Sequence, residues 1–246
     1  MTCTIVVIWN KEDIYTEFLD SLKKQKDVDF KIIGIKNDNH QYVGARQAYN
    51  DHLRAIEGSY VIFMHPDIRF LDEYALYDLL ENVKKTGDFG VVGVAGTPEG
   101  KNWQIYSDII HGMSKENAGK SVKGQKEVQT VDECLFVMNA SDIKNKKFSL
   151  LEGWHLYAVE QCVEYLLCGK KNYVIPARLW HMSAGGSLDP SYMITLNILI
   201  RKYKNELKYL NTTVKQWKTN GMPAAIYRIY YYYKQKLKRW LQCRKK

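Results

Sequence analysis

The chain has 246 residues, and its hydrophobic content of 46% is enough to bury one sizeable core. No stretch approaches the roughly 20 apolar residues of a membrane span, and the N-terminal residues enter a strand at once. We therefore expect neither a transmembrane helix nor a signal peptide. The five cysteines form no CxxC pair, which favours buried thiols in a reducing cytosol.

The net charge of +9 is concentrated near the C-terminus. Of the 36 Lys and Arg residues, 11 lie after Glu206, where no Asp or Glu occurs. Residues 1–206 thus hold 25 Lys and Arg against 27 Asp and Glu. This asymmetry indicates that the tail alone contacts an anionic surface.

Strands and helices alternate over the first 95 residues. Apolar runs predict the strands, and apolar residues at helical spacing predict the helices. The strands cover residues 4–9, 30–35, 59–64 and 89–95, and the helices cover 12–25, 44–56 and 72–85. Short connections between them favour an α/β fold with a mostly parallel central sheet and helices on both faces.

The pattern changes after residue 96. Residues 97–127 are polar and rich in Gly and Lys, which is typical of a long loop or an irregular hairpin. A strand over 127–139, a helix over 154–168 and a strand over 173–180 follow. Asp189 and Pro190 then begin a helix that runs to about residue 207, as an N-cap followed by a proline.

The third predicted strand ends in the segment His65-Pro66-Asp67. The four apolar residues before it are typical of a strand buried on both faces, and Pro66 ends the strand because it has no N–H to donate. His65 and Asp67 therefore emerge at the carboxyl edge of the sheet, where α/β proteins bind ligands. A surface aspartate in a strand-to-helix turn is an equally good explanation of Asp67.

Polar residues also follow the other predicted strands: Asn10 after the first, Asn37 and Asp38 after the second, and His181 after the last. Parallel strands bring such ends to one edge of the sheet. A carboxylate and a histidine, with phosphates and waters in the remaining positions, suit Mn²⁺ or Mg²⁺. Alternatively, His181 has only a structural role and satisfies polar groups of the neighbouring loop. The glycine-rich residues 183–187 would let their backbone approach a diphosphate closely.

Glu160 lies inside the apolar stripe of the helix predicted over 154–168. Burial there would favour the protonated carboxyl and would suit it to general-base catalysis. A buried ion pair with an arginine such as Arg178 is an equal alternative. Trp154 and His155, at the start of the helix, would either stack on a sugar ring or pack in the core.

Five segments in order resemble the family 2-type glycosyltransferases of the GT-A fold. They are residues 43–68, 90–97, 128–138, 153–170 and 181–187, and with the residues between them they cover roughly residues 4–190. More narrowly, the chain resembles the bacterial glycosyltransferase-like branch with His-x-Asp in place of Asp-x-Asp. No GxGxxG or Walker A motif is present, which weighs against a dinucleotide or P-loop fold.

The resemblance implies an inverting hexosyl transfer from a UDP- or dTDP-sugar to a hydroxyl of a glycan or lipid-linked saccharide. The reaction would serve bacterial surface polysaccharide or glycoconjugate synthesis. The residues that correspond to donor-binding positions are Trp9, Asn10, Asn37, Asp38, Arg46 and His65. Asp67 corresponds to the metal-binding last Asp of the family motif, and His181 to a metal or diphosphate contact. Gly153, Trp154 and His155 correspond to the acceptor side.

Two residues depart from the family pattern. His65 replaces the first Asp of the common motif, which alters the ribose contact. Ala158 stands where the family's DxDxC pattern has its catalytic Asp, and Glu160 keeps the second acidic position. Glu160 is therefore a candidate base, as are Asp132 and Glu152. The alternative is a catalytically weak or inactive protein of the same fold that binds nucleotide sugars or acts as a scaffold.

Pro223 begins a predicted basic amphipathic helix. Its apolar face holds Ile226, Ile229, Tyr230, Tyr233, Leu237, Trp240 and Leu241. Such a helix lies naturally in a membrane interface, although packing on its own domain or a homodimer contact would also use that face. Nucleic-acid binding is disfavoured, because no recognised module accompanies the charge. We therefore expect a transferase domain over residues 1–207 and a tail over 208–246, peripheral on the cytoplasmic face of the plasma membrane.

Overall fold

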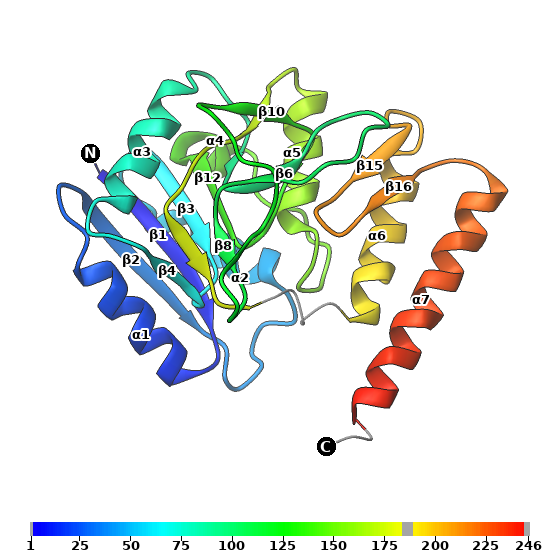
Figure 1. The fold of residues 1–246 in the computed structure, drawn as a ribbon, viewed down its shortest axis with the longest axis horizontal. Coiled ribbons are helices and arrows are strands. Elements are labelled where there is room, and N and C mark those ends of the chain that lie inside the picture. The colour runs from blue at the N-terminus through cyan, green and yellow to red at the C-terminus, as the bar shows by residue number, and fades with distance from the viewer. Residues whose placement is uncertain (1, 184–188, 244–246) are drawn as a thin grey trace.

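The computed structural model describes residues 2–183 and 189–243, which form a three-layer α/β body with a long C-terminal helix beside it (Figure 1). The central sheet has seven strands. Their spatial order is β2 (Asp29–Lys36), β1 (Thr2–Trp9), β3 (Tyr60–Met64), β12 (Leu135–Asn139), β5 (Val92–Gly93), β13 (Asn172–Val174) and β10 (Lys126–Val128). Five of the seven strands point the same way, and β12 and β10 run against their neighbours. The predicted α/β fold with a mostly parallel sheet is confirmed.

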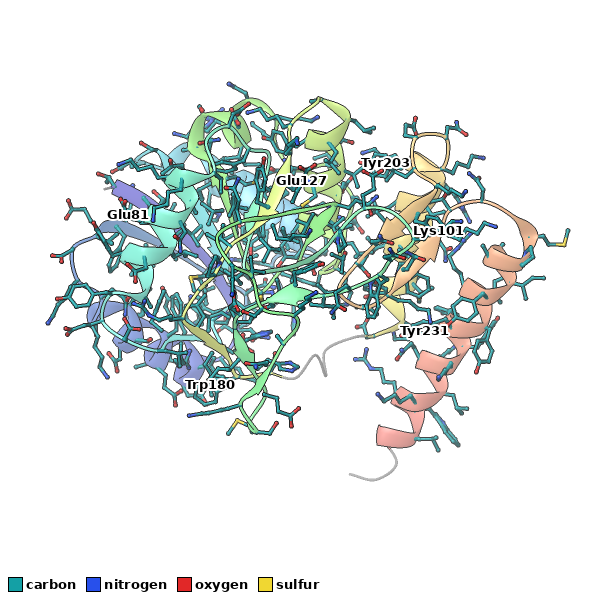
Figure 2. The ribbon with its side chains drawn as sticks, turned by 45° about the horizontal axis from the view of Figure 1, so that its top comes forward. Glu81, Lys101, Glu127, Trp180, Tyr203 and Tyr231 are labelled. Carbon is teal, nitrogen blue, oxygen red and sulfur yellow. The ribbon has the colours of Figure 1, made fainter. Side chains whose placement is uncertain are left out.

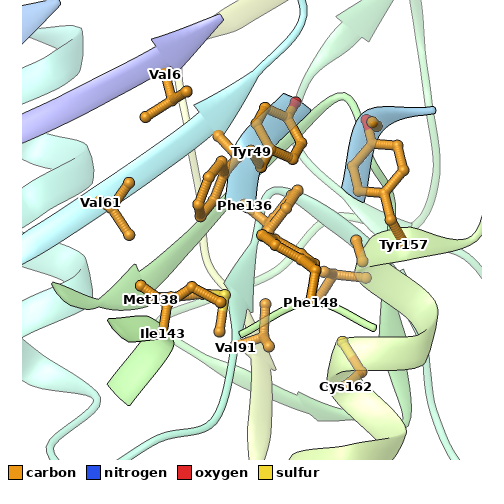
Figure 3. Packing of buried hydrophobic residues seen from close by; sticks show 14 of the residues in the cluster. Val6, Tyr49, Val61, Val91, Phe136, Met138, Ile143, Phe148, Tyr157 and Cys162 are labelled. Atoms are coloured by element: carbon orange, nitrogen blue, oxygen red, sulfur yellow. The ribbon is translucent and has the colours of Figure 1, made fainter. Parts of the chain in front are cut away.

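Alternating side chains on the strands build a hydrophobic core on each face of this sheet. In β1, Cys3, Ile5 and Val7 face α1 (Glu12–Lys23) and α3 (Ala75–Lys85), whereas Val6 faces the opposite layer. That layer consists of α2 (Ala45–His52), the short turn η1 (Leu53–Ala55), α4 (Ala140–Asn145) and α5 (Tyr157–Leu167). Figure 3 shows its aromatic centre, where Tyr49, Phe136, Phe148 and Tyr157 pack together.

Three predicted strands are each divided between separate sheets. Residues 89–95 yield only β5, followed by β6 (Ala95–Thr97), which pairs with β7 (Tyr106–Ser107) and β11 (Thr130–Val131). Residues 127–139 yield β10 and β12 of the central sheet, with β11 of the second sheet between them. Residues 173–180 yield β13 and then β14 (Leu179–His181), with Pro176 between them. Because proline lacks an N–H, it ends the hydrogen-bond ladder of the central sheet, and the chain leaves this sheet.

The released strand β14 joins a four-stranded sheet. Its neighbours are β4 (Ile68–Phe70) on one side and β8 (Ile110–His111) with β9 (Glu116–Asn117) on the other. Strands β7, β8 and β9 all come from the segment that the sequence predicted as a long loop or irregular hairpin. This small sheet links the segment after β3 to the segment before residue 184, and so places His181 beside Asp67.

A third core lies between α5, α6 (Pro190–Tyr203) and a hairpin of β15 (Tyr209–Asn211) and β16 (Gln216–Lys218). Asp189 caps α6 as predicted, because its carboxylate accepts a hydrogen bond from Ser191 N at 2.7 Å. Helix α7 (Met222–Cys243) packs along α6, and Figure 2 shows Tyr231 on the side of α7 that faces the body. Among the described residues, none of the helices is both long and apolar enough to cross a bilayer.

Candidate active site

A cluster of two histidines and one aspartate lies where β3 ends. The possible ligand atoms of His65, Asp67 and His181 all lie within 4.8 Å of one another. The backbone fixes this arrangement: His65 N donates to Cys134 O at 2.9 Å, and Met182 N donates to Asp67 O at 3.0 Å. The structure thus brings Asp67 and His181 together, and it adds His65, which the sequence had assigned to a ribose contact.

The cluster is electrostatically coupled. Burial disfavours the ionised form of Asp67, but its hydrogen bond with His181 and the nearby imidazole charges outweigh burial and hold the pKa of the carboxyl well below its usual range. Burial also disfavours charge on His181, yet Asp67, at 3.4 Å from His181 Nε2, raises the pKa of that imidazole. Burial lowers the pKa of His65. The aspartate therefore stays anionic beside two nitrogen donors, which is a suitable environment for a divalent cation.

A cavity of about 380 Å³ opens beside this cluster. Its size falls within the usual range for small-molecule sites. The charged and polar groups that line it include His65, His181, Asp132, Glu133, His155 and Ser183. The remaining wall is mostly apolar, with Ile105, Ile109, Val159 and Val214 among its residues.

Two adjacent carboxylates, Asp132 and Glu133, enter the cavity just before β12. Because β12 runs against β3, its beginning lies at the edge of the sheet where β3 ends. The sequence prediction treated residues 127–139 as one strand, so it placed Glu133 within a strand and overlooked it. A break in the apolar pattern at this acidic pair is the signal that would have located the strand's beginning.

The two carboxylates have different environments. Asp132 accepts hydrogen bonds from Cys134 N at 3.0 Å and from the Thr213 hydroxyl, and these bonds hold its pKa below the usual value although burial opposes ionisation. Glu133 Oε1 accepts from Tyr157 N at 2.6 Å, at the beginning of α5. Burial, together with the charge of Asp132, raises the pKa of Glu133 to about 8.

Arg46 and Glu160 form a buried ion pair behind the cavity. Arg46 Nε lies 2.8 Å from Glu160 Oε2, and the two side chains are only 1% and 4% exposed. Glu160 also accepts hydrogen bonds from Ser149 and Lys202. Its partner is therefore Arg46 and not Arg178. Neither Arg46 nor Glu160 lines the cavity, so the geometry favours the ion-pair interpretation of Glu160 over a role as base.

Arg46 also supports the loop that leads into α5. Its guanidinium donates to His155 O at 3.2 Å and to Leu156 O at 2.9 Å. Leu156 adopts a left-handed conformation with φ of 61°. The arginine predicted to flank the donor pocket thus holds the backbone of the predicted acceptor loop in place.

The three predicted acceptor residues, Gly153, Trp154 and His155, lie in this loop. His155 lines the cavity, and its Nε2 lies 3.5 Å from Asp189 Oδ1, while Trp154 is 39% exposed. Gly153 has φ of 108° and passes very close to Gly44: a Cβ on Gly44 would lie 2.5 Å from Gly153 N. Two glycines therefore allow the loop to approach the beginning of α2.

Four predicted donor contacts lie where β1 and β2 end: Trp9, Asn10, Asn37 and Asp38. Trp9 stacks on Tyr15 with ring centroids 4.6 Å apart, and Asn37 Oδ1 accepts from Tyr42 N at 2.9 Å. Asn10 is exposed, and so is Asp38, which pairs with Lys36 at 3.0 Å. None of the four lines the cavity, although β1 and β2 run parallel to β3 and end at the same edge of the sheet. The predicted diphosphate loop falls mostly on residues 184–188, outside the described residues.

Residues 4–203 match the sequence profile of a family described as "Glycosyltransferase like family". The chain belongs to this glycosyltransferase-like family. The match covers most of the sequence and includes every residue of the cluster and of the two cavity carboxylates. Among proteins of curated function, none matches the sequence significantly.

Two solved structures show the same fold. One is S. aureus TarS residues 1–349 in complex with UDP-GlcNAc, with a TM-score of 0.54 and 14% identity, over 83% of this chain and 67% of that chain. The other is the mannosyltransferase PcManGT from Pyrobaculum calidifontis in complex with GDP-Man and Mn²⁺, with a TM-score of 0.53 and 12% identity, over 82% of this chain and 63% of that chain. The GT-A fold expected of this glycosyltransferase-like protein is confirmed.

Proposed function

We propose that the protein transfers a hexose from a UDP- or dTDP-sugar to a hydroxyl of a glycan or lipid-linked saccharide, with inversion at the anomeric carbon. The observation that carries this proposal is the His65–Asp67–His181 cluster at the edge of a cavity that also holds two carboxylates. Family membership adds the reaction class. A lipid-linked acceptor at the cytoplasmic face of a bacterial plasma membrane, for surface polysaccharide or glycoconjugate synthesis, fits the basic C-terminal helix.

The donor atoms of the cluster fit a divalent transition metal. Two imidazole nitrogens and one carboxylate, all within 4.8 Å, match Mn²⁺ better than Mg²⁺, which prefers an all-oxygen shell. When bound there, the cation would supply the positive charge that stabilises a departing diphosphate. The binding of Mn²⁺ with GDP-Man by the structural neighbour PcManGT is consistent with this choice.

The protein's own residues would orient the two substrates from opposite sides. Asn10, Asn37 and Asp38 lie at the same sheet edge as the cluster and would hold the base and ribose. His155 lines the cavity on the α5 side and would contact the acceptor. The reacting hydroxyl would thus enter between the cluster and the carboxylates that precede β12.

Nucleotide binding and sugar transfer together test this function. We expect UDP or dTDP to raise the melting temperature of the full chain, more strongly with Mn²⁺ than without, and a matching nucleotide sugar to be consumed in the presence of an acceptor. The same measurement with GDP tests the preference for the nucleotide base, and the same measurement with Mg²⁺ tests the preference for the metal. No thermal shift with any nucleoside diphosphate, and no consumption of UDP-, dTDP- or GDP-sugars, would contradict the proposal.

Helix α7 carries features of a membrane-surface helix. One side packs on the body through Tyr231 and Tyr232. An exposed apolar stripe repeats every three to four residues along it: Met222, Ile226, Ile229, Tyr230, Tyr233, Leu237 and Leu241. Lysines 234, 236 and 238 are exposed as well. We propose that this stripe enters the interface of an anionic bilayer, with the lysines near its headgroups.

Two glutamates placed in the stripe should prevent vesicle binding. We expect Ile229→Glu/Leu237→Glu to reduce binding to phosphatidylglycerol-containing vesicles by about 100-fold or more, since each buried Leu or Ile contributes about 1.5–3 kcal/mol. Vesicle flotation at low and high salt measures this. Leu150→Glu is the matched control, because Leu150 is 93% exposed and lies on the body. Equal vesicle binding by the wild type, the double variant and the control would show that α7 does not contact the bilayer.

A further inference from the structure

We infer that Glu133 takes the proton from the acceptor hydroxyl, in place of the aspartate that family members carry where this chain has Ala158. This inference rests on the proposed function, because it assigns the base for that transfer. Ala158 lies in the first turn of α5 and is fully buried. Its side chain is a methyl group, which can neither accept nor donate a proton. A base for this transfer must therefore come from another element, and Glu133 lines the cavity.

Glu133 contacts the same first turn of α5 from the segment that precedes β12. Its Oε1 accepts a hydrogen bond from Tyr157 N at 2.6 Å, and its carboxylate also interacts with the backbone N–H of Ala158. The helix itself has no side-chain cap from its own N-cap residue, Leu156. A carboxylate that precedes β12 thus occupies the N-terminus of the helix on which the family places its aspartate, and it lines the cavity.

The other candidate acids are engaged or lie elsewhere. Both oxygens of Asp132 accept hydrogen bonds, from Cys134 N and from the Thr213 hydroxyl. Glu160 is paired with Arg46 outside the cavity. Glu152 is exposed and does not line the cavity.

Glu133 differs from these acids because, within the described residues, it has no ion pair and no hydrogen bond to another side chain. Its hydrogen-bond donors are the backbone N–H groups of Tyr157 and Ala158, and the charges of Asp132 and Arg46 act on it from nearby. Burial is the main cause that raises the pKa of Glu133 to about 8, and the negative charge of Asp132 is the next. The carboxylate of Glu133 is therefore a stronger proton acceptor than that of an ordinary glutamate. General bases work best when their pKa lies near the working pH.

The step balances without any further reactant. The acceptor oxygen forms a bond to the anomeric carbon of the sugar while the bond from that carbon to the diphosphate oxygen breaks. The electron pair of the broken bond leaves with the nucleoside diphosphate. The hydroxyl proton moves to the Glu133 carboxylate, which later releases it to water.

Glu133→Gln separates a base from a simple helix cap, because glutamine keeps an oxygen that accepts from Tyr157 N but loses basicity. We expect kcat to fall by about 100-fold or more, with the melting temperature and the affinity for the nucleoside diphosphate close to wild type. Glu133→Asp, which keeps a carboxylate, should retain more activity than Glu133→Gln. Glu99→Gln, at an exposed acid that does not line the cavity, is the matched control and should leave kcat unchanged.

The pH profile gives a second readout. The deprotonated carboxylate is the active form, so wild-type kcat should rise as pH increases toward about 8, the raised pKa of Glu133, and level off above it. In Glu133→Gln this rise should be absent.

Each contrary outcome has a distinct meaning. A wild-type chain that transfers no sugar overturns the proposed function and this inference with it. Wild-type transfer with an unchanged rate in Glu133→Gln overturns the inference alone. Loss of transfer together with loss of the melting transition or of nucleotide binding makes Glu133 a helix cap, and this also overturns the inference.

Discussion

Asparagine in place of Asp67 is expected to lower sugar transfer by about 1000-fold and to leave the fold intact. Asp67 is the only carboxylate of the His65–Asp67–His181 cluster, so the variant keeps its shape but loses its negative charge. Asparagine is a neutral, weaker ligand, and the charge that stabilises a departing diphosphate contributes several kcal/mol to catalysis. A loss of about 4 kcal/mol corresponds to this factor.

Two measurements check this expectation. Transfer rates at saturating Mn²⁺ give the loss in turnover, and the thermal shift on adding Mn²⁺ with a nucleoside diphosphate reports metal binding directly. The shift should be present in wild type and absent in Asp67→Asn. Asp20→Asn removes an exposed aspartate that pairs with Lys23, and it should behave as wild type in both assays. Full activity of Asp67→Asn with metal present would refute the metal role.

Methionine in place of Arg46 is expected to destabilise the protein by about 3–5 kcal/mol, since it leaves the buried Glu160 without its main partner. Lys202 still reaches Glu160 at 3.0 Å, which favours the lower end of this range. The carbonyls of His155 and Leu156 would also lose their donors. For a chain of this length, a loss of about 3 kcal/mol corresponds to a fall in Tm of about 6–12 °C.

Arg178→Met provides the comparison for this effect. Arg178 pairs with Asp72 and Asp78, but its side chain is 49% exposed, so the loss should be about 0–1 kcal/mol. Thermal or urea denaturation of both variants measures the difference. In the double variant Arg46→Met/Glu160→Gln, the unpaired charge is removed and part of the stability should return. Equal losses for Arg46→Met and Arg178→Met would contradict the assignment of a buried pair.

Local patterns predicted the first half of the fold well. The strands β1, β2 and β3 and the helices α1, α2 and α3 lie within a few residues of their predicted bounds, because apolar runs and helical spacing are properties of the segment itself. The division of residues 89–95, 127–139 and 173–180 between separate sheets could not be predicted in this way. Sheet membership depends on contacts with distant strands: a Cβ on Gly93 would lie 2.5 Å from the Cβ of Val131, so β11 passes there only because Gly93 has no side chain.

The candidate site, too, was predicted from the sequence only in part. The sequence predicted that Asp67 and His181 meet, from the rule that ligands bind at the carboxyl ends of parallel strands. The two residues do lie together, but through the small sheet in which β14 pairs antiparallel with β4. That rule says nothing of the beginnings of antiparallel strands, and for this reason Glu133 was overlooked. The pairing of Arg46 with Glu160 joins residues far apart in the chain, and only tertiary packing selects Arg46 over Arg178.

The β15–β16 hairpin determines how short a working version of this protein can be. Residues 208–218 were assigned to the tail from charge alone, yet Thr212, Thr213 and Val214 form part of the cavity wall, and Trp217 is buried in the third core. Thr213 also holds Asp132 in place. A truncated protein that ends at residue 207 would therefore lack one side of the cavity. A minimal catalytic fragment must extend at least to the turn before α7.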